Sequence, residues 1–149
     1  MKKIIISIIF LLTLLTEFSN ATEKFLSLKK SKVNVRYGPS FDSKIKYIYK
    51  KINLPIKLID KKENWRRIID LKNNSGWIHS SQLNEKSNSI IILKDKILFK
   101  KSSNLSRPIA RIEKGRLLVI SKCEDNWCSV TTDDYYGWIK AENIWGSIK

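Results

Sequence analysis

Residues 34–40 read NVRYGPS, residues 64–68 read NWRRI and residues 76–78 read GWI, and these stretches decide the fold. The later part of the pattern recurs, because residues 126–128 read NWC and residues 137–139 again read GWI. The Asn-Trp pair and the Gly-Trp-Ile stretch are therefore repeated in the same order and at nearly the same separation in the second half of the chain. A self-similar unit of this size predicts two copies of one small domain in a single chain.

The segments around these motifs are typical of short β-strands. Residues 32–36 alternate between polar and apolar, with Val33 and Val35 on one face. The Gly-Pro pair within residues 37–40 indicates a turn. Similar short apolar stretches lie at residues 45–49, 54–59, 65–69, 77–79, 90–93, 97–99, 109–112, 117–121, 127–131 and 135–139. The sequence therefore predicts an all-β protein, with short strands spaced as in a small barrel or sandwich.

The start of the chain, residues 1–21, has the order of a secretory signal peptide. Lys2 and Lys3 precede an apolar run at residues 4–15, and residues 19–21 (SNA) supply small residues for cleavage. This apolar run is short for a membrane-spanning helix, which needs about 20 apolar residues. We expect cleavage after Ala21, no stable membrane span afterwards, and export to the periplasm or cell envelope. Retention of the segment as an N-terminal anchor is the alternative.

The remaining chain divides at a polar stretch. We expect a first domain at residues 22–84, a short linker at residues 85–89 and a second domain at residues 90–149. Domains of about 60 residues are only marginally stable alone. The two domains are therefore expected to pack together or to carry a covalent staple.

The chain is strongly basic, with 29 Lys and Arg against 14 Asp and Glu and a net charge of +15. Such a charge attracts anionic polymers, membrane surfaces or nucleic acid. Only six of the basic residues are Arg, and the chain is also rich in Ile and Asn, so AT-rich codon usage is an equal explanation. Export argues against nucleic acid as the partner. The oligomeric state is not determined by the sequence.

Cys123 and Cys128 are the only cysteines and flank a four-residue turn. With His79 as the only histidine, the chain lacks the four ligands of a structural zinc site, so we expect neither a metal nor a cofactor. A hairpin would place the two thiols opposite each other, and an exported chain meets an oxidising compartment, so we expect a disulfide. A redox role is the alternative, although the spacing is not Cys-x-x-Cys. Lys61 and Arg66 stand at the corresponding positions of the first copy.

The opening motif at residues 34–40 resembles that of bacterial SH3-type domains, often called SH3b, and the two tryptophan stretches of the first copy match that family's tryptophan strands. Residues 124–130, 137–139 and 144–146 are similar to the second domain of an exported two-copy SH3-like family of Gram-negative bacteria. The resemblance covers residues 26–146. It implies two small, partly open SH3-like barrels in tandem and a non-catalytic role in binding the cell wall or peptides.

The second copy departs from the opening motif. It lacks the Gly-Pro turn, and the alignment places Phe99 and Lys100 where Val35 and Arg36 stand.

Aromatic and arginine side chains of the first copy form the candidate binding surface. Tyr37, Trp65 and Trp77 would supply aromatic walls for a glycan or a proline-rich peptide. Arg36 and Arg66 would supply guanidinium groups for a carboxylate or phosphate. The alternatives are that Trp65 caps the barrel core and that the arginines form an ordinary solvated face.

The second copy offers Trp127, Trp138 and Tyr135 as corresponding candidates, and Trp127 has the same alternative of capping a core. A Cys–His hydrolase needs a nucleophile, a base and an orienting group. Here the histidine and the cysteines belong to different copies, so the sequence predicts that the protein is not an enzyme.

Together these features predict a non-catalytic binding module of the cell envelope. It would recognise a peptidoglycan component, or an envelope protein or peptide, through an aromatic groove. The alternative is a structural or assembly partner, with two rigidly packed SH3-like domains and no groove for a small ligand.

Overall fold

The computed structural model describes residues 23–148, which form fourteen β-strands and one 3-10 turn. The expected signal segment, its cleavage after Ala21 and its alternative as an anchor lie outside the described residues. The first seven strands and the turn are β1 (Phe25–Leu28), β2 (Val33–Arg36), β3 (Ile45–Tyr49), β4 (Pro55–Lys62), β5 (Trp65–Ile69), β6 (Ser75–His79), η2 (Ser80–Gln82) and β7 (Leu83–Asn84). The remaining strands are β8 (Ser89–Ile92), β9 (Lys96–Phe99), β10 (Pro108–Ile112), β11 (Leu117–Glu124), β12 (Trp127–Thr131), β13 (Tyr136–Lys140) and β14 (Ile144–Gly146).

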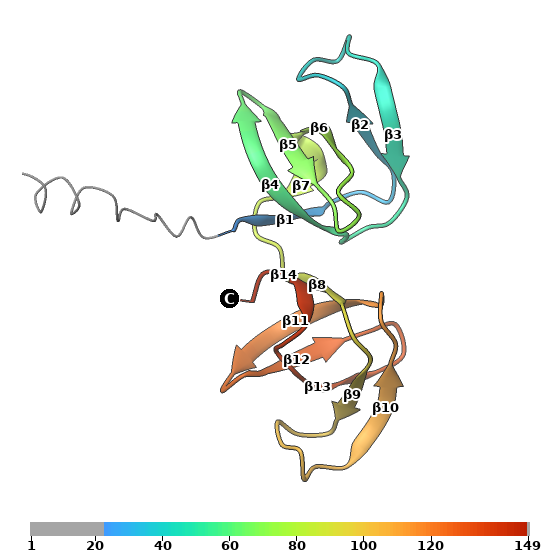
Figure 1. Cartoon of the computed structure of the whole chain (residues 1–149), viewed down its shortest axis with the longest axis vertical. Coiled ribbons are helices and arrows are strands. Elements are labelled where there is room, and N and C mark those ends of the chain that lie inside the picture. The colour runs from blue at the N-terminus through green and yellow to red at the C-terminus, as the bar shows by residue number, and fades with distance from the viewer. Residues whose placement is uncertain (1–22, 149) are drawn as a thin grey trace, which may run out of the picture.

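Each half of the chain forms one antiparallel seven-stranded sheet, and the two sheets share one topology (Figure 1). The strand order is β3-β2-β6-β5-β4-β1-β7 in the first sheet and β10-β9-β13-β12-β11-β8-β14 in the second. Each strand of the second sheet thus has its counterpart in the first. In the described residues the outermost strands of a sheet do not pair with each other, so neither sheet closes into a full barrel. The predictions of an all-β fold and of a tandem repeat are confirmed.

Each copy has a hydrophobic core of its own. On β2, Val33 and Val35 are fully buried while Asn34 and Arg36 are partly exposed, as the alternation of the sequence requires. The first core consists of Leu26, Leu28, Val33, Val35, Ile56, Ile68, Ile78 and Leu83. The second consists of Ile90, Ile92, Leu98, Ile112, Leu118, Ile120, Cys128, Val130 and Ile139. The two cores share no residue, so each copy holds its fold with its own side chains.

The glycine of each Gly-Trp-Ile stretch lies where two strands approach closely. A Cβ added at Gly76 would overlap Cγ1 of Val35 and lie 3.0 Å from the carbonyl oxygen of Arg36. A Cβ added at Gly137 would lie 2.7 Å from the carbonyl oxygen of Phe99. These contacts are made where β6 passes β2 and where β13 passes β9. The recurring glycine is therefore a steric requirement of the fold.

The second copy carries a cross-strand disulfide. Cys123 on β11 pairs with Cys128 on β12 in the sheet register, and the two sulfur atoms are bonded. Lys61 and Arg66 form the equivalent pair in the first copy. The expected disulfide is confirmed, and it is specific to the second copy.

Reducing this disulfide is expected to lower the free energy of unfolding of the second copy by about 2 kcal/mol, because the closed loop is short. Urea unfolding of the native chain with and without a reductant measures the change. A chain with Cys123→Ser and Cys128→Ser is the control, because it has no disulfide and the reductant should not change its stability. Equal stability in both conditions would contradict a stabilising role for the bridge.

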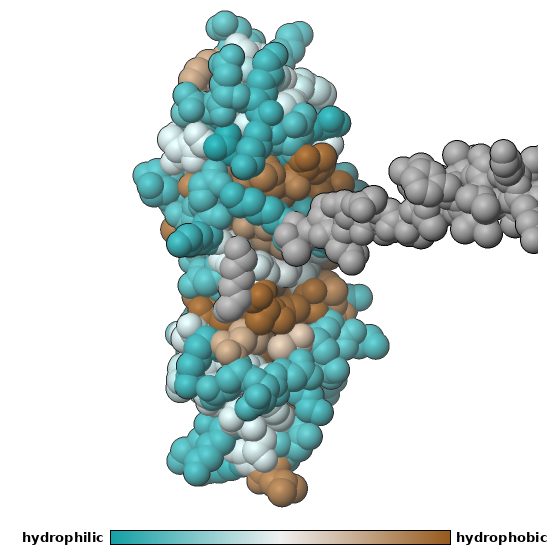
Figure 2. All heavy atoms as spheres, turned by 90° about the vertical axis from the view of Figure 1, so that its left-hand side faces the viewer, coloured by the Kyte–Doolittle hydropathy of each residue, from teal (hydrophilic) through white to brown (hydrophobic). Residues whose placement is uncertain are grey.

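Trp145 of β14 joins the two copies. Its ring meets Phe25 of β1 edge to face, with ring centroids 5.1 Å apart. Its indole N–H donates a hydrogen bond of 3.3 Å to the carbonyl oxygen of Pro55 in β4. Figure 1 places β14 and β8 at the junction, and Figure 2 shows hydrophobic side chains gathered around it. The expectation that the two small domains pack together is met at this contact.

Candidate functional site

The outer face of the first sheet brings an aromatic side chain between two arginines. In the strand register, Trp77 on β6 lies beside Arg36 on β2 and, on its other side, beside Arg67 on β5. The neighbouring Ile78 points the opposite way and is fully buried in the core. Trp77 is half-buried and Arg67 is exposed. An indole flanked by two guanidinium groups is therefore open to solvent on this face.

Trp65 lies on the same face but is covered. Only 7% of its surface is exposed, because Phe41 packs on it with ring centroids 5.0 Å apart. His79, its register partner, lies 5.3 Å from it in the same way. Phe41 itself is 64% exposed. A ligand on this face would meet Phe41 before Trp65. In the sequence Phe41 directly follows the turn motif at residues 34–40. Its spacing gave no indication that its ring would cover Trp65.

Arg36 fixes the turn that carries Phe41. One guanidinium nitrogen of Arg36 donates a hydrogen bond of 2.7 Å to the carbonyl oxygen of Ser43, and its guanidinium carbon lies 5.9 Å from the Phe41 ring centroid. Tyr37 in the same turn is 66% exposed, with the ammonium nitrogen of Lys46 5.5 Å from its ring centroid. The residues Arg36, Tyr37, Phe41, Arg67 and Trp77 are called the first-copy face below.

Arg66 is turned away from the first-copy face. In the register it pairs with Ile78, whose side chain lies in the core, on the face of the sheet opposite to Trp77. The guanidinium group of Arg66 bonds to neighbouring groups of the protein itself. It forms an ion pair of 3.2 Å with Glu85 and donates to the carbonyl oxygens of Glu63 (2.9 Å) and Trp65 (3.1 Å). The structure therefore separates Arg66 from Arg36 and Trp77, and Arg67 takes the place expected for it.

Glu85, the partner of Arg66, also connects the linker to Lys24, the residue before β1. Its carboxylate accepts a hydrogen bond of 2.8 Å from the ammonium group of Lys24. This hydrogen bond, together with the charges of Lys24 and Arg66, holds the pKa of Glu85 below its ordinary value. The carboxylate therefore stays ionised and keeps Arg66 engaged.

The second copy presents a more open aromatic face. Trp138 on β13 lies beside Phe99 on β9, and the ammonium nitrogen of Lys122 is 5.2 Å from its ring centroid. Trp127 packs against Phe99 at 5.6 Å and has the ammonium nitrogen of Lys140 at 6.0 Å. Trp127 and Trp138 are both half-buried. Two lysines contact the tryptophans of this face, which is called the second-copy face below. The register partners of Trp138 are Phe99 and Ser129, so within the described residues no arginine flanks it in the sheet.

Tyr135 lies outside the strands that carry these two tryptophans. It precedes β13, is 49% exposed, and its backbone carbonyl accepts a hydrogen bond of 2.9 Å from the amide of Thr132. Tyr136, one residue on, is the tyrosine whose hydroxyl accepts a hydrogen bond of 3.1 Å from Ser129. Ser129 is the register partner of Trp138, so Tyr136 joins the second-copy face.

The register corrects the alignment of the two copies at one position. Trp77 pairs with Arg36 and Trp138 pairs with Phe99, so Phe99 corresponds to Arg36 and not to Val35. Leu98, which is fully buried, takes the place of Val35. A shift of one residue moves a strand side chain to the other face, which is why Phe99 belongs to the surface and not to the core.

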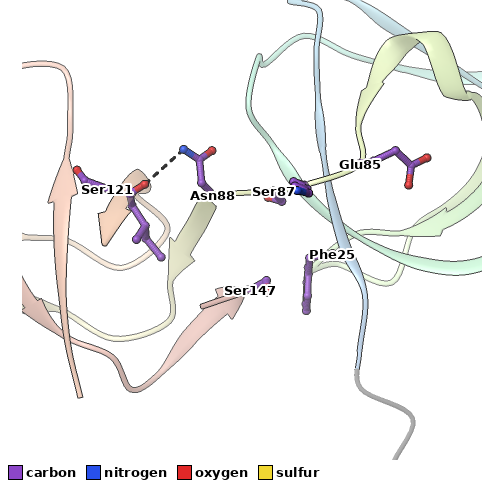
Figure 3. Close-up of a pocket in the computed structure, with 8 residues that line it drawn as sticks. Phe25, Glu85, Ser87, Asn88, Ser121 and Ser147 are labelled. Carbon is purple, nitrogen blue, oxygen red and sulfur yellow. Dashed lines mark hydrogen bonds between the residues drawn. The ribbon is translucent and has the colours of Figure 1, made fainter. Parts of the chain in front are cut away.

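Hollows large enough for a small ligand lie at the junction of the copies. One of about 460 Å³ lies beside the linker, where Figure 3 shows Ser87 and Asn88 running between Phe25 and Ser121. Its Asn88 side-chain amide donates a hydrogen bond of 3.3 Å to the carbonyl oxygen of Ile120. Another hollow, of about 620 Å³, is bordered by β3 of the first copy and by Gly115 of the second. The candidate residues from the sequence line neither hollow.

Within residues 23–148, no group of three or more His, Cys, Asp or Glu side chains is placed to hold a metal ion. The same residues include no helix with the length and apolar composition of a membrane span. His79 has its Nδ1 2.8 Å from the hydroxyl of Ser81 and its ring against Trp65, while both cysteine sulfurs are bonded to each other.

Several solved structures are similar to the chain at low sequence identity. NlpC2 and NlpC1 from Trichomonas vaginalis are each 12% identical with a TM-score of 0.39, and the matches cover 87% of this chain and 50% and 48% of those chains. An NlpC/P60 family protein from Bacillus cereus is 13% identical with a TM-score of 0.34, covering 81% of this chain and 55% of that one. The chain thus spans about half the length of these structures.

No curated protein matches the chain in sequence. The sequence does match the family described as the bacterial SH3 domain, over residues 29–85 and again over residues 97–146. Each match falls within one of the two sheets of identical strand order and leaves out only its first strand, β1 or β8, and the first residue of β9. Domains of this family are typically non-catalytic binding modules, commonly found in the envelope or outside the cell. The chain therefore belongs to the bacterial SH3 domain family, with two SH3-like copies in tandem.

Proposed function

We propose that the protein is a non-catalytic binding module of the cell envelope that recognises a peptidoglycan component. The observation that carries this proposal is the first-copy face, where Trp77 lies between Arg36 and Arg67 beside the exposed Phe41. The order of charged, apolar and small residues at the N-terminus supports export to the compartment where peptidoglycan lies.

The chemistry of the face suits a ligand that combines an apolar surface with a carboxylate. A flat aromatic ring buries a large area at little cost in conformational entropy. A guanidinium group forks two hydrogen bonds to one carboxylate. Arg36 uses one N–H group in its hydrogen bond to the carbonyl oxygen of Ser43, and Arg67 is exposed. The face therefore keeps other guanidinium N–H groups that can donate hydrogen bonds to a ligand. Peptide stems of peptidoglycan offer both features.

A second candidate is an assembly role, in which the protein docks onto another envelope protein or peptide as a rigid pair of domains. The contacts of Trp145 with Phe25 and Pro55 favour it, because they fix the two copies relative to each other. The Trp77→Ala variant described next distinguishes peptidoglycan recognition from the assembly role. An assembly role does not require Trp77 to bind sacculi, so it predicts no loss of sacculus binding in the variant.

Replacing Trp77 with alanine is expected to weaken binding to purified cell-wall sacculi by at least about tenfold, the usual effect of truncating an aromatic anchor. Co-sedimentation of the chain from residue 22 onward measures the change. Amide hydrogen exchange in β5 and β6 verifies that the variant keeps its fold. Binding equal to that of the native chain, with the fold intact, would contradict the proposal.

A matched pair of arginine variants separates the face from general charge. Arg67→Ala and Arg107→Ala remove the same charge from exposed positions, but Arg107 lies between β9 and β10 of the second copy. Only Arg67→Ala should weaken sacculus binding. Equal weakening by both variants would indicate adhesion of a polycation instead of recognition by the face.

A further inference from the structure

The hollow of about 620 Å³ at the junction has the features of a small-ligand cleft. Its first-copy wall is formed by β3, by the start of β4 and by the turn between β5 and β6, and the second copy closes it with Ile91 and Gly115. Clefts between domains are common ligand sites, and this size is usual for them. The hollow beside the linker in Figure 3 shares no lining residue with it, and is lined mainly by serines and by exposed linker residues.

Polar groups at one end of this cleft form a directed hydrogen-bond chain around the buried Asp70. Asp70 is 9% exposed, and its carboxylate accepts hydrogen bonds from the backbone amides of Lys72 and Asn74, both at 2.9 Å, and from the Asn74 side chain. The Tyr49 hydroxyl donates to the same carboxylate at 2.9 Å. Since the proton of Tyr49 is used there, the Tyr47 hydroxyl, 3.4 Å away, must be the donor to Tyr49.

This chain fixes what the cleft can offer a ligand. With its proton directed at Tyr49, the Tyr47 oxygen has only lone pairs left and can accept a hydrogen bond from a ligand hydroxyl or amide. Burial raises the pKa of Tyr47, and burial raises the pKa of Tyr49 strongly, so both hydroxyls keep their protons. The Asn74 amide nitrogen donates to Asp70, which leaves its side-chain oxygen as a further acceptor.

The rest of the cleft is apolar and nearly neutral. The rings of Tyr47 and Tyr49 stand at 80° with centroids 5.2 Å apart, so one presents a face where the other presents an edge. Leu54, Leu71 and Ile91 complete the apolar wall. Among the lining residues only Asp70 and Lys72 carry a charge, and Asp70 is already fully hydrogen-bonded. A ligand rich in hydroxyl groups, with an apolar face and no net charge, fits this arrangement best.

We propose that this cleft binds an N-acetylated amino sugar of a glycan strand, with a sugar hydroxyl or amide donating to Tyr47 and the acetamido methyl group against Leu54 and Leu71. The proposal adds a second site, distinct from the first-copy face. It rests on the proposed function only for the source of the sugar, which is the cell wall. The glycan and a peptide stem could then be held by different parts of one molecule.

Titration of the full chain with N,N′-diacetylchitobiose, followed by amide NMR signals, tests the proposal. Saturable shifts are expected at residues 70–74 and at Gly115. Tyr47→Phe keeps the ring and removes the acceptor, and it should weaken binding roughly fivefold, as for one lost hydrogen bond. Tyr135→Phe is the matched control, because Tyr135 is exposed, precedes β13 and lines neither the cleft nor the first-copy face, so this variant should leave the affinity unchanged.

Three results would overturn the proposal: no saturable shift at the cleft, shifts confined to the first-copy face, or cleft shifts produced by a stem tetrapeptide and not by the sugar. Failure of the proposed function would look different. In that case sacculus binding would not respond to Trp77→Ala, while the cleft signals would still respond to the sugar.

Discussion

Replacing Gly76 with alanine is expected to destabilise the first copy by about 1–3 kcal/mol, the usual cost of forcing an extra methyl group into a packed site. The added Cβ would overlap Cγ1 of Val35 and approach the carbonyl oxygen of Arg36 at 3.0 Å. Neither group can move aside easily, because Val35 is fully buried and the carbonyl belongs to the backbone of the neighbouring strand. Urea unfolding, with hydrogen exchange resolving the two copies, measures the loss.

Ser75→Ala is the control for Gly76→Ala, since Ser75 lies on the same strand and is half-buried. It should change stability by less than about 0.5 kcal/mol, as surface substitutions usually do. Gly137→Ala should repeat the effect in the second copy, where the added Cβ would lie 2.7 Å from the carbonyl oxygen of Phe99. A Gly76→Ala chain as stable as the Ser75→Ala chain would contradict the close crossing of β2 and β6.

Replacing Trp145 with alanine is expected to remove about 2–3 kcal/mol of coupling between the two copies, because an aromatic pair, a hydrogen bond and part of the buried ring are lost together. The aromatic pair is the one with Phe25, and the hydrogen bond is the one to Pro55. The native chain should unfold in one coupled transition, because each copy stabilises the other through this contact. The variant should unfold in two separate transitions.

Trp145→Phe tests the assignment of these contributions. Phenylalanine keeps a ring against Phe25 and loses only the N–H group that donates to Pro55, so it should retain most of the coupling. Interdomain residual dipolar couplings from NMR give an independent measure of rigidity. If Trp145→Ala left both the single transition and the dipolar couplings unchanged, the junction described here would be wrong.

The strands and the repeat could be predicted from the sequence because they depend on local patterns. Alternation placed Val33 and Val35 in the core, and the second Gly-Trp-Ile stretch indicated a second copy with the same strand order. The disulfide could be predicted because only four residues separate Cys123 from Cys128, so a hairpin places the two side by side on β11 and β12.

The composition of the candidate site could not be predicted as well, because it depends on tertiary packing. Phe41 covers Trp65 from a turn that Arg36 and backbone hydrogen bonds hold against the sheet. Arg66 and Arg67 are adjacent in sequence, and only the register shows that Arg67 shares a face with Trp77. Local periodicity cannot decide which of two neighbouring arginines a sheet turns outward when both are polar.

The junction and its cleft were also beyond sequence reasoning. Trp145 belongs to the second copy, and its partners Phe25 and Pro55 lie in the first. No pattern within one copy specifies how two copies pack. Tyr47 and Tyr49 could be noticed as aromatic residues of a strand, but their hydrogen-bond chain to Asp70 exists only in the folded turn between β5 and β6.

Co-sedimentation of the chain with purified sacculi across a salt series tests the central claim of specific wall binding most directly. At about 0.5 M salt the screening length is only a few ångströms, so binding by net charge alone should be lost. Recognition by the first-copy face should persist there, because the stacking of Trp77 and the short bonds of Arg67 depend little on long-range charge. The claim would be contradicted if binding disappeared at modest salt and the native and Trp77→Ala chains showed the same salt dependence. That result would indicate only a basic protein adhering to anionic polymers.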